Sequence, residues 1–187
     1  MIKNLEEYNK IITKINTIKI NPPHINEEYV NSLGIDHILF KSKYNKLCKT
    51  WWGLECLFIF DCEAKRFVTN IISSHINEPI IIAMISDDVD MFKKYFTDRH
   101  IYYVDFCCLC GSNKIIEDIY FKYNKEHLLK SMDAIGFAIS SDNYKLAKDI
   151  AIIFKQNKKD HGIINLYSVK KESYLCVKYI EELFSNI

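Results

Sequence analysis

Glycine and proline are scarce in this chain, with five glycines and three prolines among 187 residues. Turn-rich β architectures draw on both, because glycine adopts positive φ angles and proline fixes the corner of a turn. Their scarcity favours a mainly helical chain. The hydrophobic (49%) and charged (26%) fractions are ordinary for a globular protein, and the length suffices for one domain with a sizeable core.

The chain also has no marked excess of positive or of negative charge. Lysine and arginine number 25 against 24 aspartates and glutamates, and no block of like charge dominates either half. Proteins that bind nucleic acid usually carry a basic footprint, because they neutralise phosphates. We therefore expect no nucleic-acid partner.

The chain has no long apolar run. The longest, residues 79–85, is too short to cross a bilayer, and the charged residues 1–10 do not resemble a signal peptide. Seven cysteines, an odd number at uneven spacings, fit free and mostly buried thiols in a reducing compartment. We expect a cytoplasmic or otherwise intracellular protein, neither secreted nor in a membrane. Abundant Ile, Lys, Asn and Tyr, whose codons are AT-rich, fit a protist or a large DNA virus.

Motifs of catalysis are missing as well. There is no Walker loop, no GxGxxG and no GxSxG. The histidines are scattered without metal-ligand spacing: His24, His37, His75, His100, His127 and His161. A Cys/His nucleophilic pair assembled by folding is left open. The sequence predicts no catalytic residue, no metal and no cofactor.

Two local patterns invite a metal-site interpretation. Cys107 and Cys110 form a CxxC, but zinc needs four ligands and no second pair follows, so we predict buried packing. The acidic run 87–90 lacks the central Gly and terminal Glu of a calcium loop, and helix capping explains it more simply.

The N-terminal part contains two predicted helices. Apolar residues at steps of three and four predict an amphipathic helix over 4–20, which Asn21-Pro22-Pro23 would end. A second helix is expected to begin near Asn26 as its cap and to stop at Gly34. Residues 35–60 are apolar without a clean period and fit buried helices or strands. Of Trp51 and Trp52, one ring is expected in the core and the other is left open.

One packing pattern recurs four times, at 80–96, 106–121, 136–152 and 166–182. Each copy aligns on a small residue, with an apolar residue eight positions later and an apolar or aromatic one twelve positions later. These three sets are Ala83, Cys108, Ala138 and Ser168; Met91, Ile116, Leu146 and Cys176; and Tyr95, Tyr120, Ile150 and Ile180. A polar break at 86–88, 111–113, 141–143 and 171–173 would separate a short first helix from a longer second one. Such repeats are typical of stacked units, each unable to bury its apolar face alone.

These units resemble degenerate ankyrin repeats of the kind common in large viral and protist families. In the first copy Ala83 takes the alanine position, Asp87 the glycine and Asp90 the acidic residue, and the apolar pair and the lysine follow at 91–93. The third copy keeps Ala138, Leu146, Ala147 and Lys148, and the last keeps Cys176, Val177 and Lys178. The Thr-Pro-Leu-His signature is absent, and the repeat spacings fall short of the family's roughly 33 residues.

The resemblance implies an all-α fold, an ankyrin-like α-solenoid of stacked helix pairs with an N-terminal helical cap. Residues 1–78 would form the N-terminal helical region, with 57–78 as a candidate degenerate repeat, and 79–187 four repeats, all in one continuous domain. The sequence leaves the oligomeric state open, and we expect a monomer.

The resemblance also implies a non-enzymatic protein–protein interaction module, a scaffold or adaptor such as a virus uses against its host. The partner, another protein, would be held by the concave surface and by the loops before each first helix. The candidate contacts are Arg99, His100, Tyr103, Lys158, Lys159 and His161. For Tyr103 a core role is the alternative. A different hypothesis is a compact helical-bundle immunomodulator that holds an amphipathic helix in a groove.

Overall fold

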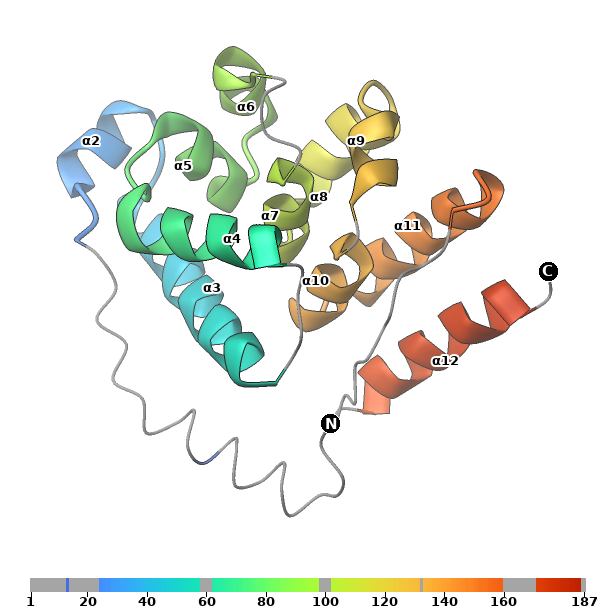
Figure 1. The fold of residues 1–187 in the computed structure, drawn as a ribbon. Coiled ribbons are helices and arrows are strands. Elements are labelled where there is room, and N and C mark those ends of the chain that lie inside the picture. Colours follow the sequence, from blue (N-terminus) through green and yellow to red (C-terminus); the bar gives the residue numbers. More distant parts are fainter. Residues whose placement is uncertain are drawn as a thin grey trace.

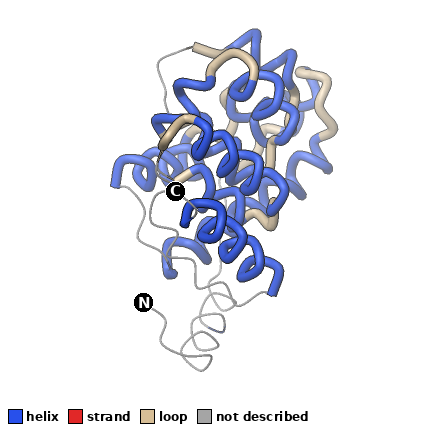
Figure 2. Tube along the Cα trace, turned by 90° about the vertical axis from the view of Figure 1, so that its right-hand side faces the viewer, coloured by secondary structure: helices blue, strands red, loops and turns tan. Residues whose placement is uncertain are grey.

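The computed structural model describes residues 13, 24–57, 62–97, 102–131, 133–159 and 171–185, and every regular element among them is helical (Figures 1 and 2). The predicted all-α class is confirmed for this part of the chain. The helix predicted over 4–20 lies outside it, Thr13 excepted. The elements are α2 (Glu27–Ser32), α3 (His37–Leu57), α4 (Cys62–Ser74), α5 (Pro79–Ser86), α6 (Val89–Tyr95), α7 (Tyr103–Cys110), α8 (Asn113–Ile115), the π-helical turn η1 (Ile116–Phe121), α9 (Lys125–Lys130), α10 (Ala134–Ser140), α11 (Tyr144–Gln156) and α12 (Lys171–Ser185).

The short helix α2 has the ends that its sequence predicts. The Asn26 side chain accepts a hydrogen bond from the Tyr29 backbone N–H at 3.0 Å, so it is the N-terminal cap. Gly34 follows the helix with a φ of 79°, a left-handed conformation that glycine adopts without steric cost. Both predictions are confirmed.

Residues 35–60, which fit helices or strands by sequence, form one long helix as far as they are described. Asp36 begins α3, because its Oδ1 accepts the backbone N–H groups of Ile38 (2.8 Å) and Leu39 (3.2 Å). The helix then runs across the ends of several others (Figure 1). Lys43 donates to the Ser86 carbonyl at the end of α5 (3.1 Å), and the Trp51 ring lies 6.1 Å from that of Phe137 on α10.

Three helix–turn–helix units follow α4, with the same turn in each. The units are α5–α6, α7–α8–η1 and α10–α11. Each turn contains one left-handed residue: Asp87 (φ 61°) and Gly111 (φ 73°) directly follow their first helices, and Asp142 (φ 63°) lies two residues after the end of α10. The next N–H reaches back five residues to a carbonyl, from Asp88 to Ala83 (3.0 Å), from Ser112 to Cys107 (2.9 Å) and from Asn143 to Ala138 (2.8 Å). This pattern satisfies carbonyls that a helix end would otherwise leave unpaired.

The shared turn corrects the sequence alignment of the second unit by one residue. Counted from the left-handed position, the counterpart of Ala83 and Ala138 is Cys107, whereas the sequence alignment used Cys108. Both cysteines are fully buried, so burial alone does not separate them. The predicted break at 171–173 is also wrong, because these residues form the first turn of α12. Ser168 lies outside the described residues.

Hydrogen bonds at the turns join the first unit to the second and the second to the third. Asp87 accepts the backbone N–H groups of Lys114 (3.2 Å) and Ile115 (3.0 Å), at the start of the following unit's second helix. The Ser112 hydroxyl donates back to the Met84 carbonyl at 2.5 Å, and the Ser141 hydroxyl donates to the Cys108 carbonyl at 3.0 Å. The first helices α5, α7 and α10 therefore lie in sequence order, each held to its neighbour through its turn.

Exchange of Asp87 for glycine is expected to lower the free energy of unfolding by about 1–2 kcal/mol. Two hydrogen bonds to a charged acceptor are lost, and relief of the left-handed backbone offsets only part of that loss. Asp142 has the same conformation but accepts the Tyr144 hydroxyl within its own unit at 2.9 Å. The matched Asp142→Gly variant should change stability by less than about 1 kcal/mol. Urea denaturation of both variants checks this, and equal losses would contradict the cross-unit role of Asp87.

One apolar cluster extends from Ile25 to Ile180, and α5 is buried along Ile80–Ile85. No single described helix is long and apolar enough to span a membrane. The bent pair Arg66–Ser74 and Pro79–Ser86 passes the same test by length and composition, with an angle of 103° between its halves. Burial of α5 in the core accounts for that composition.

Candidate functional site

Of the six predicted contact residues, the structure describes Tyr103, Lys158 and Lys159, whereas Arg99, His100 and His161 lie outside the described residues. Tyr103 is 7% exposed, with the rings of Phe67 and Phe96 at 5.8 and 6.4 Å from its own. Burial raises the pKa of its hydroxyl, and Glu78 adds to that rise. This placement favours the core role that the sequence offered as the alternative for Tyr103.

Lys159 faces inward. Its ammonium donates to the carbonyls of Leu129 and Ser131 (2.5 Å to Ser131) and lies 4.7 Å from the centre of the Phe154 ring. Burial lowers the pKa of this lysine, while the charge of Asp105 opposes that shift. Lys159 thus ties the end of α11 to the end of α9. Its neighbour Lys158 is exposed, and it stays a predicted contact.

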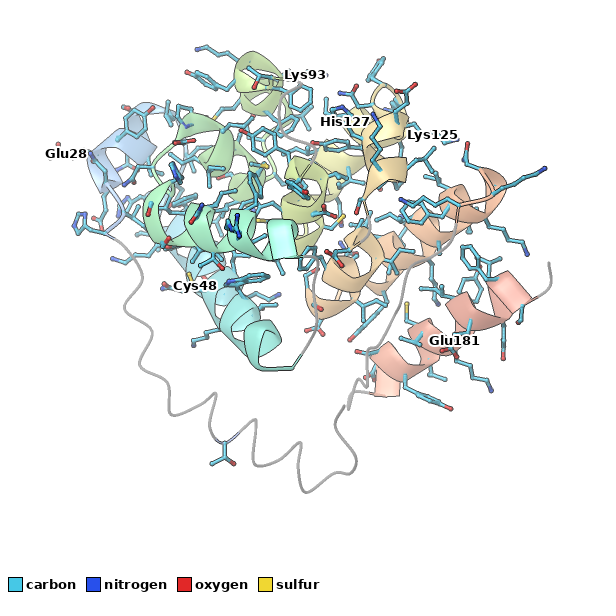
Figure 3. The ribbon with its side chains drawn as sticks, viewed as in Figure 1. Glu28, Cys48, Lys93, Lys125, His127 and Glu181 are labelled. Carbon is cyan, nitrogen blue, oxygen red and sulfur yellow. The ribbon has the colours of Figure 1, made fainter. Side chains whose placement is uncertain are left out.

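The CxxC segment lies in the core. Cys107 and Cys108 are fully buried, and burial raises the pKa of both thiols well above their usual value. Cys48 on α3, labelled in Figure 3, is also buried, and burial raises its pKa to about 11. No group of three metal-binding side chains occurs among the described residues. The packing interpretation of the CxxC is confirmed for Cys107, and Cys110 is partly exposed.

In the folded protein at pH 8, Cys48, Cys107 and Cys108 are expected to resist iodoacetamide. The reactive species is the thiolate, and a raised pKa keeps these thiols protonated at that pH. In about 6 M guanidinium, which unfolds the protein, all three should react within the time over which the native protein is tested. Mass spectrometry of the digested protein reads each site separately. Labelling of Cys107 in the native protein as fast as in the denatured one would contradict its burial.

The acidic run 87–90 caps helices, as predicted, and it caps a helix of the next unit as well as its own. Asp88 accepts the Met91 N–H at 2.9 Å and so caps its own helix α6, whereas Asp87 caps the second helix of the next unit.

Of the two tryptophans, Trp51 is fully buried, which confirms one ring in the core. The side chain of Trp52 lies outside the described part.

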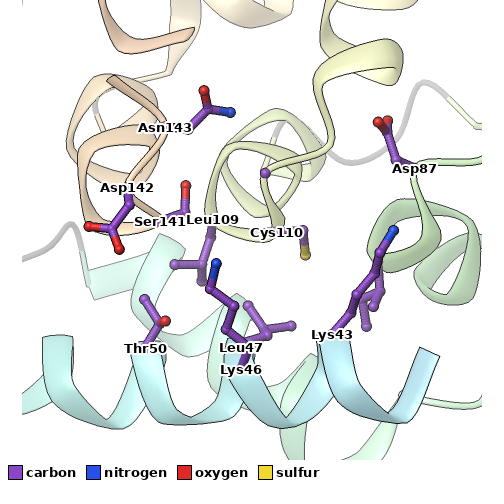
Figure 4. A pocket seen from close by; sticks show the side chains of 12 residues that line it. Lys43, Lys46, Leu47, Thr50, Asp87, Leu109, Cys110, Ser141, Asp142 and Asn143 are labelled. Carbon is purple, nitrogen blue, oxygen red and sulfur yellow. The ribbon is translucent and has the colours of Figure 1, made fainter. Parts of the chain in front are cut away.

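A pocket of about 330 Å³ lies where α3 passes the three turns (Figure 4). Helix α3 forms its floor with Lys43, Lys46, Leu47 and Thr50, and the turns supply Asp87, Gly111 and residues 141–143. Since each turn belongs to a different unit, the pocket exists only while the units are stacked and α3 lies across them. Sequence reasoning missed it, because α3 and the turns are far apart in the chain.

Some of the charged side chains in this pocket already form hydrogen bonds, and one forms no ion pair with a described residue. The carboxylate of Asp87 already accepts two backbone N–H groups, and Lys43 donates to the Ser86 carbonyl. Lys46 is exposed and forms no ion pair with a described residue, and in Figure 4 its ammonium rises from α3 toward Ser141. A second carboxylate, that of Asp142, also lines the pocket and accepts the Tyr144 hydroxyl at 2.9 Å. The pocket therefore offers the Lys46 cation and the Thr50 hydroxyl beside two carboxylates that already accept hydrogen bonds. An anionic group such as a carboxylate is the chemical complement of that cation and hydroxyl.

Comparisons of this chain with models of protein families, with curated proteins and with solved structures found no match.

Proposed function

We propose that the protein is a non-enzymatic protein–protein interaction module, an ankyrin-like stack of helix pairs that binds a protein partner at the pocket between α3 and the turns. The observation that carries the proposal is the repeated turn. Three units share one left-handed turn, and hydrogen bonds at these turns join the first unit to the second and the second to the third. Stacked units of this kind form extended surfaces to which consecutive turns contribute side by side.

Lys46 is the residue through which the proposal is tested. A partner's aspartate or glutamate at this pocket would pair with its ammonium, and reversal of the charge would place two carboxylates together. Lys93 on α6 is an exposed lysine whose side chain projects on the other side of the molecule from α3 (Figure 3). Lys93→Glu therefore makes the same change of charge away from the pocket.

The experiment is affinity capture from host cells with the wild-type protein, Lys46→Glu and Lys93→Glu, followed by quantitative mass spectrometry. We expect one set of proteins to be recovered with the wild type and Lys93→Glu and to fall at least about 10-fold with Lys46→Glu, the factor that a loss of 1.4 kcal/mol produces. Recovery of the same proteins with both variants would place binding elsewhere. Recovery of nucleic acid or a small molecule alone would overturn the proposal.

One observation favours the second candidate, a compact helical bundle. Helix α3 crosses the described first helices rather than extending their row, whereas in a simple solenoid each helix extends one of the rows. Small-angle scattering separates the two, because a stack gives an elongated particle and a bundle a nearly spherical one.

A further inference from the structure

The outer face of α12 carries an unusual share of exposed apolar side chains. Six large apolar residues are exposed in the described chain, and three of them, Tyr174 (61%), Leu175 (51%) and Tyr179 (38%), lie within six residues of this helix. Helix α12 lies at the edge of the molecule beyond α11 (Figure 1), against which it packs its other side through Cys176, Val177 and Ile180. End units of a repeat stack usually present a polar outer face, so this one departs from the rule.

The charged residues on this face are placed so that they complement an antiparallel copy of it. Lys178 lies between Leu175 and Tyr179, and Glu182 follows one turn later, with the charged atoms of the two 3.8 Å from each other. This order, lysine before glutamate, is the weaker one within a helix. Glu181 and Glu182 in the last turns also oppose the helix dipole, which prefers cations there. The pair within the helix therefore stabilises α12 only weakly.

We infer that this face binds a second copy of the chain, with the two α12 helices antiparallel about a two-fold axis near Tyr179. In that arrangement the two Tyr179 side chains meet at the axis, and Lys178 of each copy lies opposite Glu182 of the other. Leu175 of each copy then lies at one end of the contact, opposite the exposed Ser185 of the other copy. A two-fold contact uses the same patch twice, which a self-complementary row of charges satisfies.

The dimer is weak. Fifteen residues of α-helix are about 22 Å long, and a single helix pair buries well under the roughly 800 Å² per partner of a standard stable interface. We expect a dissociation constant in the range of about 10–500 µM, as for weak and transient contacts. The contact leaves the pocket over α3 open, and it does not depend on the proposed function.

Analytical ultracentrifugation of the full chain up to about 1 mM, a concentration above that range, tests the dimer. We expect Leu175→Glu to weaken dimerisation at least 10-fold, and Lys178→Glu or Glu182→Lys alone to weaken it several-fold. The exchanged double variant Lys178→Glu/Glu182→Lys should restore it, because the opposite charges again face each other across the axis. A monomer at every concentration, or no restoration by the double variant, overturns the inference.

Disulfide crosslinking between two copies tests the proximity of the two α12 helices directly, because a change in helix stability alone would not produce a crosslink. A residue near a two-fold axis lies close to its own copy, so Tyr179→Cys should form a covalent dimer under mild oxidation. Glu126→Cys, an exposed position on α9, is the matched control and should remain monomeric. Equal crosslinking at both positions would mean random collision and would contradict the arrangement. Loss of binding to another protein in the Leu175→Glu variant, with no dimer in the wild type, would assign the face to that protein instead.

Discussion

Replacement of Asp105 by alanine is expected to lower the free energy of unfolding by about 3–5 kcal/mol, the largest effect of any single charged residue in the described chain. Asp105 is 2% exposed on α7 and accepts a hydrogen bond from the Ser131 hydroxyl. That hydroxyl in turn accepts the Ala134 backbone N–H at 2.9 Å and so caps the start of α10. The inward-facing ammonium of Lys159 donates to the Ser131 carbonyl. Without Asp105, the hydroxyl and the ammonium lose the charge that orients and balances them.

Guanidinium denaturation followed by circular dichroism measures this loss. Asp118→Ala is the control, because Asp118 pairs with Lys122 on the surface, where such pairs contribute little. Asp105→Asn retains an acceptor for Ser131 and should lose less than the alanine variant. If Asp105→Ala does not fold, Asp105→Asn is compared with Asp118→Ala and the wild type instead. Equal denaturation midpoints for Asp105→Asn, Asp118→Ala and the wild type would refute the role of this network.

Replacement of Trp51 by alanine is expected to cost about 3–5 kcal/mol, as truncation of a large buried aromatic side chain usually does. Trp51 is fully buried and anchors the C-terminal half of α3 on Phe137 of α10. Its loss leaves a cavity between α3 and the helix row and releases α3 from one end of the pocket. Leu39→Ala on the same helix is the control, because Leu39 is 56% exposed. That variant should change stability by less than about 0.5 kcal/mol.

Thermal unfolding compares these variants, and hydrogen exchange of the α3 amides locates the change. We expect faster exchange in residues 47–57 of Trp51→Ala than in the wild type, because that half of α3 loses its anchor. If Trp51→Ala and Leu39→Ala melt at the same temperature, α3 is not anchored at α10.

Capping was the part of the fold most readily predicted from the sequence. Asn26, Asp88 and Asn143 each accept a backbone N–H within three residues, so the signal is local and one short segment contains all of it. The small buried positions Ala83 and Ala138 were predictable for the same reason, since helical spacing identifies an inward face. The scarcity of glycine and proline favoured a mainly helical chain, and the resemblance to ankyrin repeats implied the all-α class.

The alignment of the second unit failed because two adjacent cysteines fit one buried position. Cys107 and Cys108 have the same size and are both fully buried, so the small-residue rule could not choose between them. Gly111 carried the signal that would have chosen. Glycine is the residue best suited to a left-handed turn, and its alignment with Asp87 and Asp142 selects Cys107.

The candidate pocket could not be predicted, because it depends on contacts between distant segments. Helix α3 touches other elements along much of its length, which removes the clean apolar period by which a surface helix is recognised. Lys46 looks like any solvent-exposed lysine in the sequence. Only the crossing of α3 over three turns places it at a pocket, and that crossing comes from Trp51 meeting Phe137 in the tertiary structure.

The long reach of α3 also has a consequence for the order of folding. The three helix pairs close through neighbouring residues, so they can form early, whereas Trp51 finds Phe137 only after the intervening segments exist. During synthesis on a ribosome, α3 emerges long before α10, so the Trp51 side chain stays exposed until α10 has formed. A chaperone that recognises exposed tryptophan and phenylalanine would therefore meet this helix first, and its release would coincide with completion of α10.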